Sequence, residues 1–312
     1  MGRVAVFVAA GAAFLAALAL TLTGAGDRAD ALPNWQALVL GLVQGATELL
    51  PISSSGHLIL VPWLGDWEYL KQHDAFNQTF DVSLHLGTLI AVVLYFRGDI
   101  ARLAAALWGT VLRRRVETVD ERVAWCVAIA TVPAAVLGAL GEELIAERLG
   151  EPWQIAILLA FFGAVLWVAD RTPETRRMGD LSFRSALGVG VAQSLSLFPG
   201  VSRSGVTISA GRLLGLDRDS AARFSFLLLV PITFGAVLYK GVSDVLLSDL
   251  PPGMIGPFLV GSLASGASGL IAISALLGYV RRHNYSLFVW YRLVAGAAVL
   301  VLIATGLRTA GY

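Results

Sequence analysis

Polar side chains with the chemistry of an active site are concentrated in one apolar stretch, Gly41 to Leu60, which reads GLVQGATELLPISSSGHLIL. This stretch carries Gln44, Glu48, three consecutive serines and His57. Serine hydroxyls beside an imidazole can supply a nucleophile together with its base. An ionised carboxylate at membrane depth costs roughly 2.5 to 3.5 kcal/mol, so a glutamate in such a stretch indicates a functional site.

The spacing of these residues predicts a broken helix. Gln44 and Glu48 lie at positions i and i+4, so they share one face of a helix. Pro51 lacks an N–H and disfavours the helical conformation of the residue before it, so we expect the helix to end there. The serines Ser53 to Ser55 follow the break, where serine is a common cap and where backbone N–H groups gather as an anion site. A kinked helix with a capping serine is the structural alternative, but it leaves Glu48 and His57 unexplained.

A second stretch of the same kind, Gly188 to Gly211, reads GVGVAQSLSLFPGVSRSGVTISAG. A constant offset superposes the two stretches and pairs Gly41 with Gly190, Gln44 with Gln193, Ser53 with Ser202, Ser55 with Ser204, and Gly56 with Gly205. Phe80 to Tyr95 likewise matches Phe224 to Tyr239, so the repeat extends beyond the motif. Paired apolar segments interrupted by Gly and Pro in two halves are typical of inverted repeats with a site at the midplane.

The strings QGATELLPISSSGH and PGVSRSG, in this order, resemble those of the undecaprenyl-diphosphate phosphatases, the bacitracin-resistance family of bacterial lipid-carrier phosphatases. The resemblance extends from about Asn34 to the C-terminus. It implies hydrolysis of undecaprenyl diphosphate to undecaprenyl phosphate and inorganic phosphate at the external membrane face. This reaction recycles the lipid carrier for cell-wall synthesis and gives bacitracin resistance. The chain departs from the family at Gln44, where many members have Glu.

Phosphoryl transfer needs charge neutralisation, a nucleophile and a proton carrier. Arg203 offers a planar fork for bidentate phosphate contact, in a Gly/Ser loop whose N–H groups add donors. The resemblance implies that Ser54 attacks while His57 handles protons, although His57 remains an alternative nucleophile. We expect substrate binding by Ser53, Ser55, Ser202, Ser204 and Gly205.

All-oxygen ligands suggest a divalent cation, Mg²⁺ or Ca²⁺, that bridges the phosphate oxygens. We expect Glu48 to hold this cation with help from Gln44. Because Gln44 is neutral, the site has one negative charge fewer than a pair of glutamates would give it.

The composition shows a membrane protein. Of 312 residues, 56% are hydrophobic and 14% charged, and the mean hydropathy is +0.73. A net charge of +1 gives no indication of a nucleic-acid partner. We expect membrane lipids and a polyprenyl diphosphate as partners, and a homo-oligomer is possible. The single cysteine, Cys126, excludes an intramolecular disulfide.

Residues 1–33 contain an Ala/Leu/Val run after an early arginine, which suits a signal peptide or an extra transmembrane helix. We expect an uncleaved signal anchor, because the run is long for a signal peptide and the cleavage pattern is poor. Residues 34–312 form the expected phosphatase domain, with repeat one at about 34–170 and repeat two at about 185–307.

Loop charges orient the expected spans, which are Phe80 to Phe96, Val123 to Leu140, Trp153 to Ala169, Phe224 to Lys240, Pro257 to Val280 and Leu287 to Leu307. Arginine-rich connections at 97–122, 171–184 and 281–282 are expected to be cytoplasmic, and the acidic segment 142–151 external. This assignment requires that the first motif segment enters and leaves the membrane on the external side. The second motif segment must enter and leave it on the cytoplasmic side. We therefore expect an all-α integral membrane protein, an inverted-repeat helical bundle with two re-entrant helix-loop-helix hairpins. Its site should face the periplasm or cell exterior from a bacterial inner membrane.

Two further groups of residues have structural and functional interpretations. Asp81 and His85, at i and i+4, are metal ligands, a proton pair, or polar neighbours that orient the site, and we favour the last. A cluster of small residues is expected to let helices approach closely: Gly261, Ser262, Ser265, Gly266 and Gly269.

Overall fold

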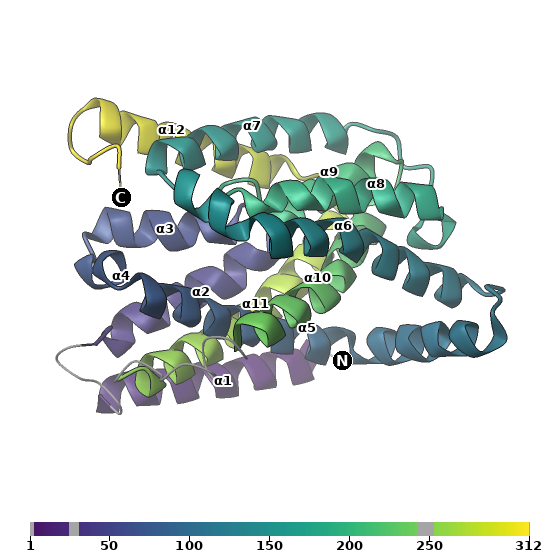
Figure 1. Cartoon of the computed structure of the whole chain (residues 1–312), viewed down its shortest axis with the longest axis horizontal. Helices are drawn as coiled ribbons and strands as arrows, with labels where there is room; N and C mark the ends of the chain where they lie inside the picture. Colours follow the sequence, from purple (N-terminus) through teal and green to yellow (C-terminus); the bar gives the residue numbers. More distant parts are fainter. Residues whose placement is uncertain (1–2, 25–30, 242–252, 312) are drawn as a thin grey trace.

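The computed structural model describes residues 3–24, 31–241 and 253–311, which form a bundle of helices (Figure 1). No β-strand occurs in these residues, so the predicted all-α class is confirmed. The α-helices are α1 (Arg3–Thr23), α2 (Asn34–Leu49), α3 (Ser54–Gly65), α4 (Glu68–Gln72), α5 (Asp74–Arg113), α6 (Val119–Arg148), α7 (Pro152–Asp170), α8 (Phe183–Ser194), α9 (Arg203–Leu213), α10 (Arg218–Lys240), α11 (Ile255–Val280) and α12 (Ser286–Ala304). Two short 3₁₀ helices, η1 (Met178–Asp180) and η2 (Leu195–Leu197), flank α8.

Within the described residues, 7 helices are long and apolar enough to cross a membrane: α1, α5, α6, α7, α10, α11 and α12. The chain is therefore a multi-pass membrane protein. The six spans expected after residue 33 all occur, but two helices are longer than their apolar segments. Helix α5 has 40 residues, about 60 Å at 1.5 Å per residue, and bends at Phe96, where φ is −97°. Helix α6 continues to Arg148, so the acidic segment that we expected to be a connection lies partly in the helix.

The first motif forms a re-entrant hairpin of α2 and α3. Leu50 is extended, with ψ of 145°, and ends α2 directly before Pro51, as predicted. Helix α3 ends beside the C-terminal residues, because Trp63 Nε1 donates to the Thr309 carbonyl at 3.2 Å and Arg308 pairs with Asp66 at 3.1 Å. The start of α2 and the end of α3 lie together on the left in Figure 1, beside the ends of α1 and α12.

The second motif forms a hairpin of α8, η2 and α9 that enters from the opposite end of the bundle (Figure 1). Segments before and after it touch, because the N–H groups of Thr175 and Arg176 donate to the Gly215 carbonyl at 2.9 Å. The Asp217 N–H in turn donates to the Arg176 carbonyl at 2.9 Å. Both ends of this hairpin therefore lie on the same side, and the two predicted hairpins are confirmed.

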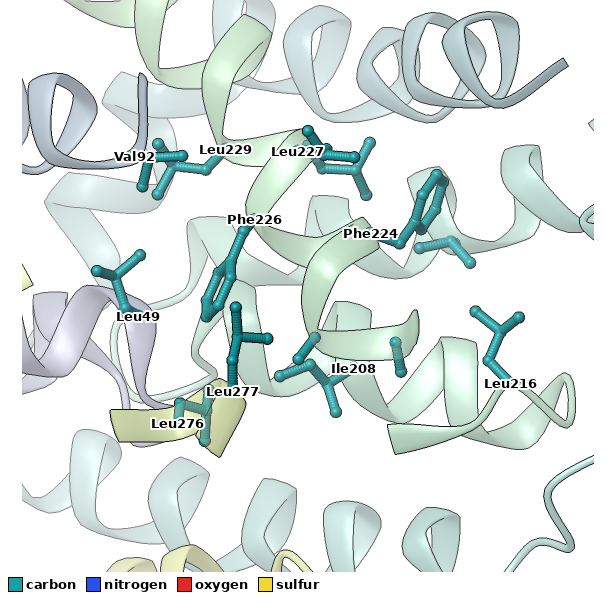
Figure 2. Close-up of a cluster of buried hydrophobic side chains, with 14 of the residues drawn as sticks. Leu49, Val92, Ile208, Leu216, Phe224, Phe226, Leu227, Leu229, Leu276 and Leu277 are labelled. Atoms are coloured by element: carbon teal, nitrogen blue, oxygen red, sulfur yellow. The ribbon is translucent and has the colours of Figure 1, made fainter. Parts of the chain in front are cut away.

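A large hydrophobic cluster supports both hairpins (Figure 2). Leu49 at the end of α2 and Ile208 in α9 pack with Phe226 of α10 and Leu277 of α11. All four side chains are almost inaccessible to solvent, so the two inner helix ends have a rigid apolar support.

Small residues bring α2 and α5 close to α11, as expected. A Cβ added at Gly45 would lie 2.1 Å from the Ser265 carbonyl oxygen, and one at Gly87 would lie 2.3 Å from the Ser262 carbonyl oxygen. Ser265 Oγ also donates to the Leu84 carbonyl at 2.7 Å. This close approach fixes the helix face that carries Gln44 and Glu48.

Candidate active site

The tips of the two hairpins meet inside the bundle. The Gly200 N–H of the second tip donates to Ser53 Oγ of the first at 3.1 Å. Ser204 Oγ donates in return to the Leu50 carbonyl at 2.9 Å. Residues far apart in the sequence therefore form one polar centre, as the repeat predicts.

The two tips have the same backbone geometry at their capping serines. Ser53 has φ of 76° and ψ of 97°, and Ser202 has φ of 76° and ψ of 114°. Each hydroxyl accepts the N–H three residues later, from Gly56 at 3.4 Å and from Gly205 at 3.0 Å. A positive φ costs energy in a non-glycine residue, so both caps retain a strained conformation of the kind found at functional sites. The first turns of α3 and α9 begin at tips that contact each other, and a helix N-terminus favours a negatively charged ligand.

Glu48 is the centre of the polar contacts and is 7% exposed. Its Oε2 accepts the Ser54 hydroxyl at 2.5 Å and the Gln44 amide at 3.4 Å. Its Oε1 accepts Arg203 Nε at 3.3 Å, and His85 Nε2 lies 3.7 Å from Oε2. The carboxylate is thus paired with a cation and hydrogen-bonded to a hydroxyl that can act as a nucleophile.

A cavity of about 310 Å³ lies over this centre. Its lining includes five residues of the two hairpin tips and their helix ends: Glu48, Ser54, Ser55, Ser202 and Arg203. Its other lining residues come from the first turns of α5, from the region of η2 and from the end of α10: Gln78, Asp81, Val82, His85, Ser196, Ile232, Thr233, Ala236, Val237 and Lys240. A mostly apolar cavity of this size with a few charged and hydroxyl groups in its wall can hold a small ligand.

His57 lies at the edge of this centre rather than in the cavity wall. Its Nδ1 donates to the Ser53 carbonyl at 2.6 Å, and its Nε2 pairs with the Tyr291 hydroxyl at 2.7 Å. Because Nδ1 carries the proton in the neutral ring, Nε2 accepts from Tyr291. Among the described residues, no hydrogen bond joins His57 to a serine hydroxyl. In this structure the group that contacts Ser54 Oγ is Glu48.

The oxygen atoms around Gln44 are of the kind that binds Mg²⁺ or Ca²⁺, but only one of the groups that carry them, Glu48, is a carboxylate. Gln44 is buried, and its Oε1 has no hydrogen-bond partner. Together with the Glu48 carboxylate and the Ser54 hydroxyl, it makes a donor set of oxygen atoms, which Mg²⁺ and Ca²⁺ prefer. Within the described part of the chain, no cluster of three or more His, Cys, Asp or Glu residues occurs, so any such site depends on the neutral amide and hydroxyl oxygens.

Arg292 of α12 is a residue of this centre that the motifs did not predict. It is fully buried, and no carboxylate pairs with it among the described residues. Its guanidinium donates to five carbonyls, of Pro51 at 3.1 Å, Gly200 at 2.9 Å, Val201 at 3.1 Å, Leu158 at 3.4 Å and Leu159 at 3.0 Å. It therefore joins both hairpin tips to α7. A single arginine within an apolar span is itself a signal of function, and it could have been found by that rule.

Asp81 and His85 lie in the cavity wall on α5, one turn apart. His85 Nδ1 donates to the Asp81 backbone carbonyl at 2.8 Å, and its Nε2 faces Glu48. This placement agrees with the interpretation of the pair as polar neighbours of the site.

Fold and site together define a polytopic membrane protein with inverted hairpins and a hydroxyl–carboxylate–guanidinium centre inside the bundle. A sequence profile of the family described as Bacitracin resistance protein BacA matches residues 37–298. The chain belongs to this family. It is 47% identical over 272 residues to the protein named undecaprenyl-diphosphatase of Pelotomaculum thermopropionicum, covering 86% of this chain and 97% of that one. The protein of the same name from Geobacter sulfurreducens is 47% identical over 270 residues, with 86% and 97% covered. The Rubrobacter xylanophilus protein of that name is 42% identical, with 86% and 97% covered.

Proposed function

We propose that this protein hydrolyses undecaprenyl diphosphate to undecaprenyl phosphate and inorganic phosphate, with Ser54 as the nucleophile. The observation that carries the proposal is the 2.5 Å contact between Ser54 Oγ and Glu48 Oε2 on the wall of a cavity that also contains Arg203. The names of the family relatives support the lipid diphosphate as substrate. The seven apolar spans within the part of the chain that the structure describes are consistent with a membrane-bound substrate.

The reaction follows from the contacts of Ser54. Its Oγ attacks the terminal phosphorus while its proton passes to Glu48. The bond between that phosphorus and the bridging oxygen breaks, and its electron pair leaves with undecaprenyl phosphate. Water then attacks the phosphoserine, Glu48 returns the proton to the departing Ser54 oxygen, and dihydrogen phosphate leaves with both hydrogens of the water. Atoms and charge balance without a further reactant.

Arg203 and the helix ends neutralise the transferred phosphoryl group. Arg203 is 10% exposed, and its Nη2 is buried without a hydrogen-bond partner, so this N–H group is available to a phosphate oxygen in the cavity. The first-turn N–H groups of α3 and α9 add neutral donors on both sides. His57 with Tyr291, and the capping serines Ser53 and Ser202, keep the tips in place.

A divalent cation, Mg²⁺ or Ca²⁺, would be held by Glu48 and by the unpaired Oε1 of Gln44. It would add positive charge where the phosphate oxygens bind. The functions of Arg203 and Ser54 derived above do not depend on it.

We also propose that the site faces the periplasm or the cell exterior in a bacterial inner membrane, where the released lipid carrier is recycled. The outer part of the cavity is lined by the start of α5 and the end of α10. Arginine-rich connections lie at the other ends of these helices, and such connections favour the cytoplasm. In right-side-out vesicles, externally added substrate should be hydrolysed and a membrane-impermeant inhibitor of the purified enzyme should block the reaction. Full activity in the presence of that inhibitor would contradict this orientation.

Phosphate release from several polyprenyl diphosphates by the purified protein, with and without divalent metal, tests the reaction. Ser54→Ala should release none, whereas Ser55→Ala should retain a measurable rate, because Ser55 lines the cavity without contacting Glu48. Substrate labelled in the terminal phosphate should transiently label Ser54. If Ser54→Ala kept the wild-type rate, the nucleophile would have to be another group, with His57 the next candidate.

Transport of a phosphorylated polyprenyl lipid is a second candidate, because the inverted hairpins that meet at the centre are a transporter architecture. A carrier does not need a nucleophile paired with a carboxylate. Movement of labelled lipid between leaflets of proteoliposomes, unaffected by Ser54→Ala and without phosphate release by the wild type, would favour transport.

A further inference from the structure

Ser225 of α10 contacts α9 at two points, although it lies outside both motif stretches. Its backbone carbonyl accepts a hydrogen bond from Arg203 Nη1 at 2.7 Å. Its Oγ lies 2.8 Å from Thr207 Oγ1, one turn beyond Arg203 on the same face of α9. One residue of α10 therefore holds both the guanidinium of Arg203 and the helix that carries it.

These contacts leave one nitrogen of Arg203 for a ligand. Nε donates to Glu48 Oε1 at 3.3 Å and Nη1 to the Ser225 carbonyl, whereas Nη2 has no hydrogen-bond partner. A guanidinium is planar and rigid, so fixing two of its nitrogens determines where the third one lies. Without the shorter contact to Ser225, the group could rotate about its longer contact to Glu48.

We infer that Ser225 is a positioning residue for the proposed reaction, because it fixes Arg203 so that Nη2 meets the phosphate that Ser54 attacks. This inference rests on the proposed diphosphatase function. Arg203 and Ser54 line the cavity and Ser225 does not, so Ser225 acts through the arginine rather than on the substrate.

The surroundings of this contact exclude water. Ser225 and Thr207 are each 1% exposed. Their neighbours in the chain, Phe224, Phe226 and Ile208, belong to the large hydrophobic cluster (Figure 2). Water therefore cannot take the place of a hydroxyl removed here, so the loss of one hydroxyl leaves the other without its partner on the facing helix.

The internal repeat places the counterpart of Ser225 at the polar centre as well. The match between α5 and α10 pairs Ser225 with Asp81. Arg203 is paired with Ser54, since each is the first helical residue after a capping serine. Asp81 lines the same cavity as Ser54. Both halves of the chain therefore bring this position of a long helix to the polar centre.

The test measures kcat and KM for undecaprenyl diphosphate in Ser225→Ala and in Thr207→Val, each of which removes one hydroxyl of the pair. Losing a buried hydrogen bond should lower kcat about three- to ten-fold and change KM less, because Arg203 is present but no longer held in place. Thr207→Ser keeps the hydroxyl and should keep most of the wild-type kcat. Ser209→Ala is the matched control, because it removes a buried hydroxyl of α9 that donates to the Gly205 carbonyl of its own helix at 2.7 Å.

A double-mutant cycle separates positioning from packing. In an Arg203→Lys background, the side chain has one nitrogen and cannot contact Glu48 and the Ser225 carbonyl while it also reaches the phosphate. Adding Ser225→Ala to this background should then lower kcat less than about two-fold, as expected when two residues act as a unit. Single-turnover measurements with enzyme in excess over substrate give these slow rates.

Wild-type kcat in both Ser225→Ala and Thr207→Val would overturn the inference, and so would an equal loss in Ser209→Ala. The same loss on top of Arg203→Lys would also overturn it, since Ser225 would then act independently of Arg203. Absence of phosphate release by the wild type would instead contradict the proposed function itself. Thermal unfolding in detergent checks the fold, and Thr207→Val tests the same contact if Ser225→Ala unfolds early.

Discussion

Ser54 and Arg203 occupy equivalent positions, each the first helical residue after a capping serine with φ of 76°. In one hairpin this position carries a hydroxyl that contacts Glu48, and in the other a guanidinium that contacts the same carboxylate. The same backbone therefore presents a hydroxyl from one side, which we propose to be the nucleophile, and a cation from the other. Glu48 lies between them and couples the two.

At Glu48, we expect the substitution to Gln to abolish phosphate release. The neutral amide can neither take the proton of Ser54 nor pair with Arg203. Phosphate release measured against Mg²⁺ and Ca²⁺ concentration tests this expectation. If Glu48→Gln kept most of its activity at every metal level, the carboxylate would be structural.

Gln44→Glu should tighten the metal dependence without raising the maximal rate much. The change adds a negative charge one helical turn from Glu48, and divalent sites strengthen with ligand charge. The half-saturating Mg²⁺ or Ca²⁺ concentration should fall relative to the wild type. Gln193→Glu is the matched control, because Gln193 is the equivalent buried glutamine of the other repeat and donates to the Ala130 carbonyl. An equal change in both variants would show that the effect is not local to Gln44.

Arg292→Lys should lower kcat about ten- to one hundred-fold with a smaller change in KM, because lysine keeps the charge but cannot donate to carbonyls of both tips at once. Steady-state kinetics with undecaprenyl diphosphate measure the changes in kcat and KM separately. A matched change, Arg308→Lys, should leave both parameters unchanged. A variant with wild-type kcat would show that the two tips hold their positions without Arg292.

At the scale of the helices, the sequence predicted the breaks well because they depend on local chemistry. Pro51 and the capping serines fix where α2 ends and α3 begins, and the repeat extends the same logic to Ser202. It did not predict that His57 turns toward Tyr291, because that contact joins α3 to α12, far away in the sequence. The position of Arg292 within an apolar span could have marked it as functional, but its partners are backbone carbonyls of both tips, which have no sequence signature.

Close packing of α2 on α11 gives a testable contrast between two glycines. Gly45→Ala should destabilise the protein by about 1–3 kcal/mol, because the new Cβ would lie 2.1 Å from the Ser265 carbonyl oxygen. Gly188→Ala should be neutral or stabilising by up to about 1 kcal/mol, because its Cβ would meet nothing within 4 Å in a helix interior. Thermal unfolding and activity in detergent measure both. Equal stability of the two variants would mean that α2 can move away from α11 without cost.

At the scale of the whole molecule, the membrane topology depends on whether both ends of the second hairpin lie on the same side of the membrane. The loops at its two ends are hydrogen-bonded to each other through Arg176, Gly215 and Asp217. In a Cys126→Ala background, Arg177→Cys and Asp219→Cys should react with an impermeant thiol reagent from the same side, and Glu151→Cys from the other. If Arg177→Cys and Asp219→Cys were labelled from opposite sides of the membrane, the segment between them would cross the membrane and would not be a re-entrant hairpin.

The length of α5 shows what apolar patterning does not determine. At about 60 Å it exceeds the roughly 30 Å of a hydrocarbon core, and its half after Phe96 extends with α6 beyond the other helices (Figure 1). The sequence placed the end of this span near Phe96, where apolar residues give way to Arg97. The residues after Phe96 still favour a helix, so the apolar segment ends near Phe96 while α5 continues to Arg113.

The shared geometry of the two capping serines has a consequence for how such a site can arise. Two identical copies of one repeat, related by a two-fold axis, would place the same residue at both first helical positions, either two hydroxyls or two guanidiniums. Two hydroxyls could attack a phosphorus atom but could not neutralise the negative charge of the phosphoryl oxygens. Two guanidiniums could neutralise this charge but could not attack. Joining the copies in one chain lets Ser54 and Arg203 differ while the backbone stays the same. Asymmetric chemistry on a symmetric frame thus requires two repeats that differ in sequence, and a single chain that contains both repeats supplies them.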